Sequence, residues 1–295
     1  MQALRNRTSA ELITYLESVD FHNINNINPT IVAANQADVI VLCIGEEAYA
    51  ETPGNIDNMM ISDSQLTLAR ELIKLNKPLI VVYAGGRPRI ITEIAEKADA
   101  VIVAFLPGNR GGEAIADIIY GNVNPSARFP ITYPRGINGH MNYDHKPLES
   151  PYSTTNNRFP DNYDPLYPFG FGLSYTTFVY SNLVLNTSNV IAPNGIKGRV
   201  DVKNTGTRSG QEVVIVYLND EYCSVTRSVK EMKSFKKINL NVNEVQTVEF
   251  EISLKEMSYY NMQNMRVYEQ GKFNIYVSQL TVSFNLVCAA KICKF

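Results

Sequence analysis

Three glutamates stand close together in the segment Gly45-Glu46-Glu47-Ala48-Tyr49-Ala50-Glu51-Thr52-Pro53-Gly54-Asn55. A carboxylic acid in a loop can give a proton to a substrate, or it can belong to a solvated acidic surface. The segment follows an apolar run at residues 39–44, which predicts a buried strand. Ligands of open α/β sheets bind at the carboxyl ends of the strands. The residues alone leave both interpretations open, a proton donor and a solvated loop.

The composition bounds the class of protein and its partners. The chain has 295 residues, of which 45% are hydrophobic and 19% charged, and a net charge of -2. These values are ordinary for a globular protein of one or two domains, and they give no reason to expect nucleic acid or a membrane as a partner. No apolar run approaches the roughly 18 residues that cross a bilayer. The first seven residues lack the apolar core of a signal peptide.

The cysteines and histidines do not form a metal-binding pattern, and no nucleotide-binding glycine motif is present, so no metal and no cofactor are expected. Cys43 lies in the first predicted strand and is interpreted as a small buried hydrophobic residue. Cys288 and Cys293 are close enough in sequence to form a disulfide, with free thiols as an equal alternative. His140 and His145 lie in a turn-rich loop where a metal site is not favoured.

The first part of the chain alternates short apolar strands with helical segments. Strands are predicted at residues 39–44, 79–83 and 100–104. Apolar residues at helical spacing predict a helix over 66–75 with its N-cap at Ser62, Asp63 or Ser64, and another over 114–119 that ends near Gly121. Pro88 is predicted in the first turn of a helix that carries Ile90, Ile91 and Ile94. The alternation predicts a parallel sheet with helices on both faces.

The rest of the chain has a different character. Pro, Gly, Asn and Tyr dominate from about residue 134 to 175 and predict an ordered connector. After about residue 178 short strands follow one another with turns between them, which predicts a β-sandwich of about 100 residues. We therefore expect an α/β sandwich domain at 1–135, a connector at 136–178 and an all-β domain at 179–295.

Several motifs in a fixed order extend this interpretation. They are Tyr49-Ala50-Glu51-Thr52-Pro53-Gly54, Gly86-Arg87-Pro88, Leu106-Pro107-Gly108, Gly121-Asn122-Val123-Asn124-Pro125-Ser126 and Phe169-Gly170-Phe171-Gly172-Leu173-Ser174-Tyr175. In this order they resemble glycoside hydrolase family 3, whose members are mostly β-glucosidases and related exo-acting β-glycosidases. The resemblance runs from about residue 30 to 280. It implies an α/β sandwich domain followed by a fibronectin type III-like (immunoglobulin-like) domain.

The resemblance also implies a role for one glutamate. In relatives that carry the Tyr-x-Glu-Thr-x-Gly loop, its glutamate is the acid/base of a retaining glycosidase, and Glu51 occupies that position. Glu46 and Glu47 are interpreted as structural. Arg87 and Arg89 could reach sugar hydroxyls or hold the acidic loop through ion pairs, and the ion-pair role is favoured. Retaining hydrolysis also needs a nucleophilic carboxylate about 5–5.5 Å away. In the family a TIM barrel supplies it, and no segment of this chain resembles a barrel.

These implications lead to an expected function and one alternative function. We expect part of a β-glucosidase-type enzyme that cleaves terminal β-linked sugars of β-glucosides or oligosaccharides with retention, and that is inactive without a TIM-barrel domain. The alternative is a non-catalytic carbohydrate-binding or partner-binding protein derived from the family. Many relatives are secreted or lysosomal, and Asn6-Arg7-Thr8 and Asn186-Thr187-Ser188 fit the glycosylation pattern of such proteins.

Overall fold

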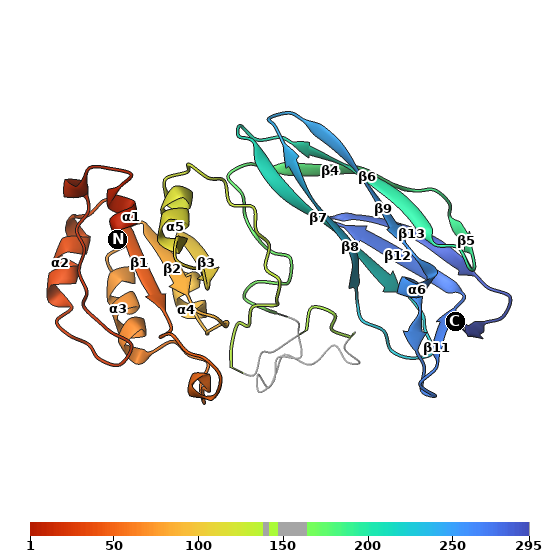
Figure 1. Cartoon of the computed structure of the whole chain (residues 1–295), viewed down its shortest axis with the longest axis horizontal. Helices are drawn as coiled ribbons and strands as arrows, with labels where there is room; N and C mark the ends of the chain where they lie inside the picture. Colours follow the sequence, from red (N-terminus) through yellow and green to blue (C-terminus); the bar gives the residue numbers. More distant parts are fainter. Residues whose placement is uncertain (138–141, 147–163, 295) are drawn as a thin grey trace. The chain divides into compact units, whose positions relative to one another are not determined.

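A computed structural model describes residues 1–137, 142–146 and 164–294 of the chain (Figure 1). The chain forms two compact units. The first contains Met1–Val123, Tyr133–His140 and Pro165–Tyr167, and the second contains Asn124–Thr132, Met141–Asp164 and Pro168–Phe295. The two units are described separately below. The predicted boundaries at residues 135 and 178 stay predictions.

The first unit is an α/β structure around a three-stranded sheet with the order β1-β2-β3. Its elements in chain order are α1 (Gln2–Arg5), η1 (Ala10–Leu12), α2 (Asn28–Gln36), β1 (Ile40–Gly45), η2 (Thr52–Gly54), α3 (Asp63–Ile73), β2 (Leu79–Ala84), α4 (Thr92–Ala95), β3 (Ala100–Phe105) and α5 (Gly111–Ile119). Both strand pairs are parallel. The predicted parallel sheet with flanking helices is confirmed.

Alternate residues of β1 face different surroundings. Ile40, Leu42 and Ile44 are buried, whereas Cys43 between them is exposed. The strand pleat sends successive side chains to opposite faces, so one face of this edge strand is covered and the other is not. The interpretation of Cys43 as a buried hydrophobic residue was therefore wrong.

The helix α3 follows its predicted signals. Ser62 is the N-cap, and its hydroxyl accepts a hydrogen bond from the backbone N–H of Gln65. The helix buries Leu66, Ala69 and Leu72, which share one face at helical spacing.

The segment before α4 differs from the prediction. The helix begins at Thr92, so Pro88 lies outside it. The reason is that neighbouring chain segments bind this stretch in an extended form. The backbone N–H of Ile90 donates to the carbonyl of Met59, and Met60 and Ile90 form a parallel bridge. A bridge of this kind replaces the local bonds that a first helical turn would need.

The second unit is built from β-sheets, as the sequence predicts. Its elements are β4 (Phe178–Leu185), β5 (Asn189–Ile191), β6 (Ile196–Asn204), β7 (Gly210–Asp220), β8 (Glu231–Leu240), β9 (Val245–Ile252), α6 (Leu254–Met257), β10 (Tyr259–Tyr260), β11 (Arg266–Glu269), β12 (Gly271–Val277), β13 (Leu280–Val287) and β14 (Ile292–Lys294). The sheets have the orders β5-β13-β12-β7-β8, β4-β6-β9 and β10-β11-β14.

The core of the second unit combines side chains from the two larger sheets. Val200 and Phe250 come from the β4-β6-β9 sheet, and Val214, Phe273 and Phe284 come from the five-stranded sheet. The rings of Phe273 and Phe284 stack with their centroids 5.4 Å apart. Two sheets that share one apolar layer form the predicted sandwich.

The remaining sequence predictions for this part concern the cysteines and the connector. All four cysteines are free in the structure, so Cys288 and Cys293 do not bridge. His140 lies outside the described residues, as do residues 138–141 and 147–163 of the predicted connector. Within the described residues, no three His, Cys, Asp or Glu side chains are arranged to hold a metal ion. No described helix combines the length and the hydrophobicity that a membrane span requires.

Candidate active site

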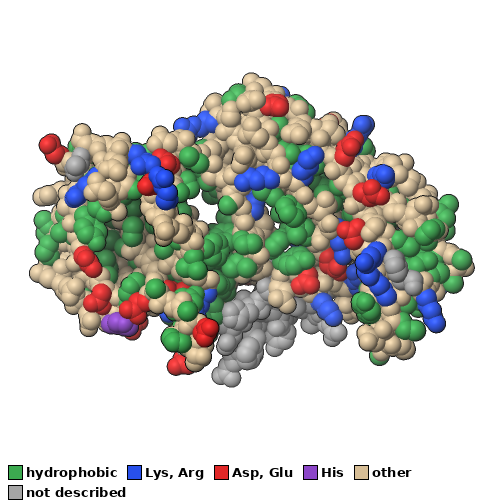
Figure 2. Space-filling model, viewed as in Figure 1, with side chains coloured by type: hydrophobic (Ala, Val, Ile, Leu, Met, Phe, Trp, Pro, Cys, Tyr) green, Lys and Arg blue, Asp and Glu red, His purple; other side chains and the backbone are tan. Residues whose placement is uncertain are grey.

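The acidic loop begins where β1 ends. Because β1, β2 and β3 are parallel, the loops that follow them, at residues 46–61, 85–91 and 106–110, leave the sheet at the same edge. Gln65 of α3 fixes the start of the acidic loop, since its side-chain amide accepts from the N–H of Gly45 at 2.8 Å and donates to the carbonyl of Gly45 at 3.1 Å. Figure 2 shows several Asp and Glu side chains exposed along the lower margin of the α/β unit, toward which β1 points in Figure 1.

The three glutamates of the loop have different surroundings. Glu46 is almost buried, with 9% of its side chain exposed, and its Oε1 lies 3.1 Å from Arg87 Nε and 3.5 Å from Arg89 Nη1. Glu47 is exposed, and its carboxylate lies 3.3 Å from His22 Nε2. The expected ion pairs of Arg87 and Arg89 with the acidic loop are confirmed, and a structural role for Glu46 stays a prediction.

Glu51 stands apart from the other two acids. Its side chain is exposed and makes no ion pair or hydrogen bond with any residue that the structure describes. Its backbone has φ 50° and ψ -138° and directly precedes η2. A side chain with a Cβ rarely adopts positive φ, and such strain costs on the order of 1–3 kcal/mol unless the surroundings impose it. The positive φ therefore marks Glu51 as a strained position in the loop.

The loop after β2 is held by two buried tyrosines. The hydroxyl of Tyr83 donates to the carbonyl of Arg87, and that of Tyr133 donates to the carbonyl of Arg89, each at 2.8 Å. Burial raises the pKa of both phenols well above its usual value. Both tyrosines consequently stay neutral and keep the proton that they donate. They hold Arg87 and Arg89 in place against Glu46.

A family model decides what this arrangement belongs to. Residues 1–175 match the glycosyl hydrolase family 3 C-terminal domain, and residues 212–280 match a fibronectin type III-like domain. The chain belongs to glycosyl hydrolase family 3. The sequence resemblance and the two fold classes it implied are thereby confirmed.

Relatives of this family 3 chain are glycosidases of greater length. It is 37% identical to a periplasmic beta-glucosidase of Salmonella typhimurium over 260 residues, which is 85% of this chain and 34% of the relative. It is 35% identical to a lysosomal beta glucosidase of Dictyostelium discoideum over 86% of this chain and 31% of that protein. A beta-xylosidase of Formosa agariphila is 36% identical over 84% of the chain. The chain thus spans about a third of the length of these curated relatives.

Solved structures agree with the family assignment. A beta-glucosidase from Listeria innocua, crystallised in complex with glucose, superposes with a TM-score of 0.83 and 28% identity. The match covers 91% of the family 3 chain and 39% of that protein.

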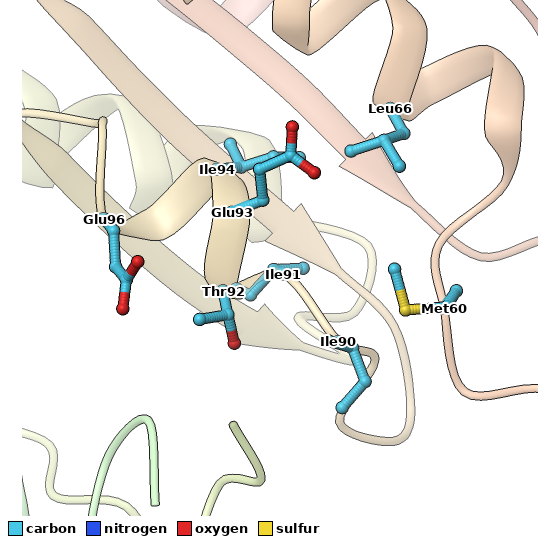
Figure 3. A pocket seen from close by; sticks show the side chains of 8 residues that line it. All are labelled: Met60, Leu66, Ile90, Ile91, Thr92, Glu93, Ile94 and Glu96. Atoms are coloured by element: carbon cyan, nitrogen blue, oxygen red, sulfur yellow. The ribbon is translucent and has the colours of Figure 1, made fainter. Parts of the chain in front are cut away.

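A hollow elsewhere in the α/β unit does not offer an alternative site for the family 3 chemistry. It has a volume of about 390 Å³ and is lined by Met60, Leu66, Ile90, Ile91, Thr92, Glu93, Ile94 and Glu96 (Figure 3). Both of its acids are engaged at 2.6 Å, Glu93 with Arg70 and Glu96 with Arg135. An apolar hollow whose carboxylates are neutralised lacks a free proton donor.

Three residues that hold the loops of this family 3 chain were missed by sequence reasoning. They are Gln65, Tyr83 and Tyr133. A weak signal existed for Tyr83, because a tyrosine inside an aliphatic strand must find a hydrogen-bond partner when it is buried. Gln65 lies in the apolar stripe of a helix, and Tyr133 lies far away in sequence, so their contacts could not be read from spacing.

Proposed function

We propose that this chain supplies the acid/base of an exo-acting glycosidase that cleaves terminal β-linked sugars with retention. Glu51 gives its proton to the leaving glycosidic oxygen and later takes one from the attacking water. The nucleophilic carboxylate comes from a TIM-barrel domain outside this chain, as the family resemblance implies. The observation that supports this role is that Glu51, alone of the three glutamates, has an exposed carboxyl without a partner among the described residues, on a backbone of positive φ.

The names of the relatives support a β-glucoside as the substrate class and a location outside the cytosol. Two are β-glucosidases described as periplasmic and lysosomal, and one is a β-xylosidase. We propose a terminal β-linked glucose as the sugar, with xylose as the variant to test beside it, and a secreted or lysosomal protein.

The test uses a hybrid enzyme, in which this chain replaces the matched segment of the Salmonella typhimurium relative. We expect the hybrid to hydrolyse 4-nitrophenyl β-glucoside, and Glu51→Gln to lower its turnover by about 10²- to 10⁴-fold, the usual contribution of acid/base catalysis. The loss should shrink for a 2,4-dinitrophenyl glycoside, whose leaving group needs no proton, and azide should accelerate the variant because it attacks without a base.

Glu47→Gln is the matched control, because it removes a charge four residues earlier in the same loop. It should keep turnover within about threefold of the unaltered hybrid. A hybrid with Glu51→Gln that kept full activity on every substrate would rule out the acid/base assignment. Calorimetric binding of a β-glucoside to this chain, without hydrolysis by the hybrid, would favour the non-catalytic alternative.

A further inference from the structure

Tyr49, two residues before Glu51, is held by the loop that follows β2. The guanidinium carbon of Arg87 lies 3.9 Å from the centroid of the Tyr49 ring. Arg87 Nε also donates to the Tyr49 hydroxyl at 3.1 Å. A guanidinium in this position is attracted by the electron-rich face of the tyrosine ring. The contact ties the middle of the acidic loop to a segment nearly forty residues later in the chain.

Two glycines leave room for this ring. A Cβ at Gly54 would stand 2.5 Å from Cδ2 of Tyr49, and a Cβ at Gly86 would overlap the Tyr49 hydroxyl. Any larger residue at either position would displace the ring. The spacing in Tyr49-Ala50-Glu51-Thr52-Pro53-Gly54 therefore has a physical cause, because the chain turns around Glu51 and brings Gly54 back against Tyr49.

Glu46 secures the other side of Arg87. Its carboxylate lies 3.1 Å from the same Nε that faces Tyr49, and a second guanidinium, that of Arg89, lies 3.5 Å away. The backbone N–H of Glu46 continues the sheet by donating to the carbonyl of Ala84. The carboxylate is thus anchored to the rigid sheet and holds Arg87 over the ring.

We propose that Tyr49 is a positioning residue for the acid/base, and that Glu46 and Arg87 act through it. The ring clamps the chain on one side of Glu51, and the Gly54 contact clamps it on the other. Between the two clamps the backbone is forced into the positive φ that presents the carboxyl. The catalytic part of this inference rests on the proposed function of Glu51. The mechanical part concerns this chain alone.

The mechanical part is tested on the chain itself by amide hydrogen exchange. The reporters are the N–H groups of Gly54 and Asn55, which donate at 2.9 Å to the carbonyls of Glu51 and Thr52. Tyr49→Ala should speed their exchange at least tenfold. Tyr49→Phe, which keeps the ring, should change it less than threefold. Tyr260→Ala is the matched control, because Tyr260 also carries an arginine over its ring, at 6.0 Å, in the other unit.

A second variant covers the case in which Tyr49→Ala does not fold. Arg87→Lys keeps the positive charge beside Glu46 but removes the planar group over the ring, and it should speed exchange at the same two amides. The amides of β1 and β2 show whether the sheet is intact. Unchanged exchange at Gly54 and Asn55 in a folded Tyr49→Ala or Arg87→Lys chain would overturn the clamp.

The catalytic part is tested in the hybrid enzyme. We expect Tyr49→Ala to lower kcat on 4-nitrophenyl β-glucoside about 100-fold with little change in KM, since a misplacement of about 1 Å has that effect. In kcat/KM, which reports the first step alone, the loss on the 2,4-dinitrophenyl glycoside should be at most threefold, because this leaving group needs no proton. Added to Glu51→Gln, Tyr49→Ala should cause no further loss, because residues that act as a unit are not additive.

The outcomes separate the two proposals. Equal losses on both substrates, or a further loss in the double variant, would overturn the positioning role and leave the proposed function of Glu51 intact. Full activity of the Glu51→Gln hybrid would overturn the proposed function, and the exchange result would still stand for the clamp in the chain.

Discussion

At the scale of single residues, the structure separates acids that look alike in sequence. Glu46, Glu47 and Glu51 lie within one loop, yet the first pairs with two arginines, the second with a histidine, and the third with no described residue. Glu46 and Glu47 are therefore engaged inside the protein, whereas the side chain of Glu51 is left exposed. The proposed acid/base role of Glu51 rests on this difference.

The strain at Glu51 predicts an unusual effect on stability. Glycine adopts positive φ without steric cost, so Glu51→Gly should relieve a strain of about 1–3 kcal/mol in the folded chain. Part of this stabilisation is offset because glycine also increases the conformational entropy of the unfolded chain. We expect the free energy of unfolding of the first unit to rise by about 1 kcal/mol, measured by exchange of the amides of β1 and β2. Glu51→Gln keeps the strain and serves as the control. A glycine variant no more stable than the glutamine variant would show that the φ value is not strained.

Asp220, at the end of β7, predicts a pH dependence in the second unit. Burial raises its pKa to about 6, although Arg227 opposes the shift. At pH values between the ordinary pKa of an aspartic acid and about 6, Asp220 is therefore protonated in the folded chain and charged in the unfolded chain. The stability due to Asp220 is complete below that window and is lost as the pH rises through about 6. The Asp220→Asn variant should lose this contribution, so that its free energy of unfolding falls by about 1 kcal/mol less than that of the unaltered chain as the pH rises. This value is discounted for the partial exposure of Asp220.

The measurement is the free energy of unfolding by amide exchange in β7 and β12, at several pH values from 4 to 7. Neighbouring Glu269 acts in the other direction. Burial favours its neutral form, but hydrogen bonds from Ser224 and other groups lower its pKa, so its contribution is lost as the pH falls. Asp201 is the control, because hydrogen bonds from Thr247 and Asn182 lower its pKa. Asp201→Asn should leave the change in the free energy of unfolding between pH 4 and 6 as it is in the unaltered chain. If Asp220→Asn also left it unchanged, the prediction would be refuted.

At the scale of elements, each unit depends on its own apolar layer. In the second unit, Phe273 and Phe284 face each other on neighbouring strands and are each 1% exposed. A large-to-small substitution at such a position loses the free energy gained by burying the removed atoms, and it also leaves a cavity that destabilises the fold further. The pair is therefore a test of how the sandwich is stabilised.

Phe284→Ala should lower the free energy of unfolding of the second unit by about 3–5 kcal/mol. The readout is amide exchange in β12 and β13, which reports on this unit even where the whole chain does not unfold in a single step. Phe235→Ala is the matched control, because that ring is 63% exposed on β8, and it should change stability by less than about 0.5 kcal/mol. Similar effects of both substitutions would contradict a core that depends on the stacked pair.

The elements were largely predictable, and their contacts were not. Continuous apolar runs located β1, β2 and β3, because strands of a parallel sheet are covered on both faces. Apolar residues at helical spacing located the buried face of α3. Pro88 was misplaced because the backbone of residues 87–90 is bonded to other segments: Ile90 donates to the carbonyl of Met59, and the hydroxyls of Tyr83 and Tyr133 donate to the carbonyls of Arg87 and Arg89. Such bonds join segments distant in sequence and leave no local signal. The positive φ of Glu51 is hidden for the same reason, since only the neighbours of Tyr49 impose it.

At the scale of the whole molecule, the proposed function gives this chain one of the two carboxyl groups of the reaction. Retaining hydrolysis needs a nucleophile about 5–5.5 Å from the acid/base. In the acidic loop, Glu46 is committed to Arg87 and Arg89, and Glu47 is held beside His22. The relatives, of which this chain spans about a third, offer the remaining length in which a nucleophile domain would lie.

This leads to a prediction about the chain by itself. Removal of a nucleophile typically lowers turnover by several orders of magnitude, so the purified chain should hydrolyse 4-nitrophenyl β-glucoside at least about 10⁴-fold more slowly than the hybrid enzyme at equal molar concentration. The Glu51→Gln chain, purified in the same way, measures any contaminating glycosidase of the host. A rate well above that background, abolished by Glu51→Gln, would mean that a second carboxyl of this chain attacks the sugar. The search for that nucleophile would then cover the other acids of the loop, Glu46, Glu47 and Asp57.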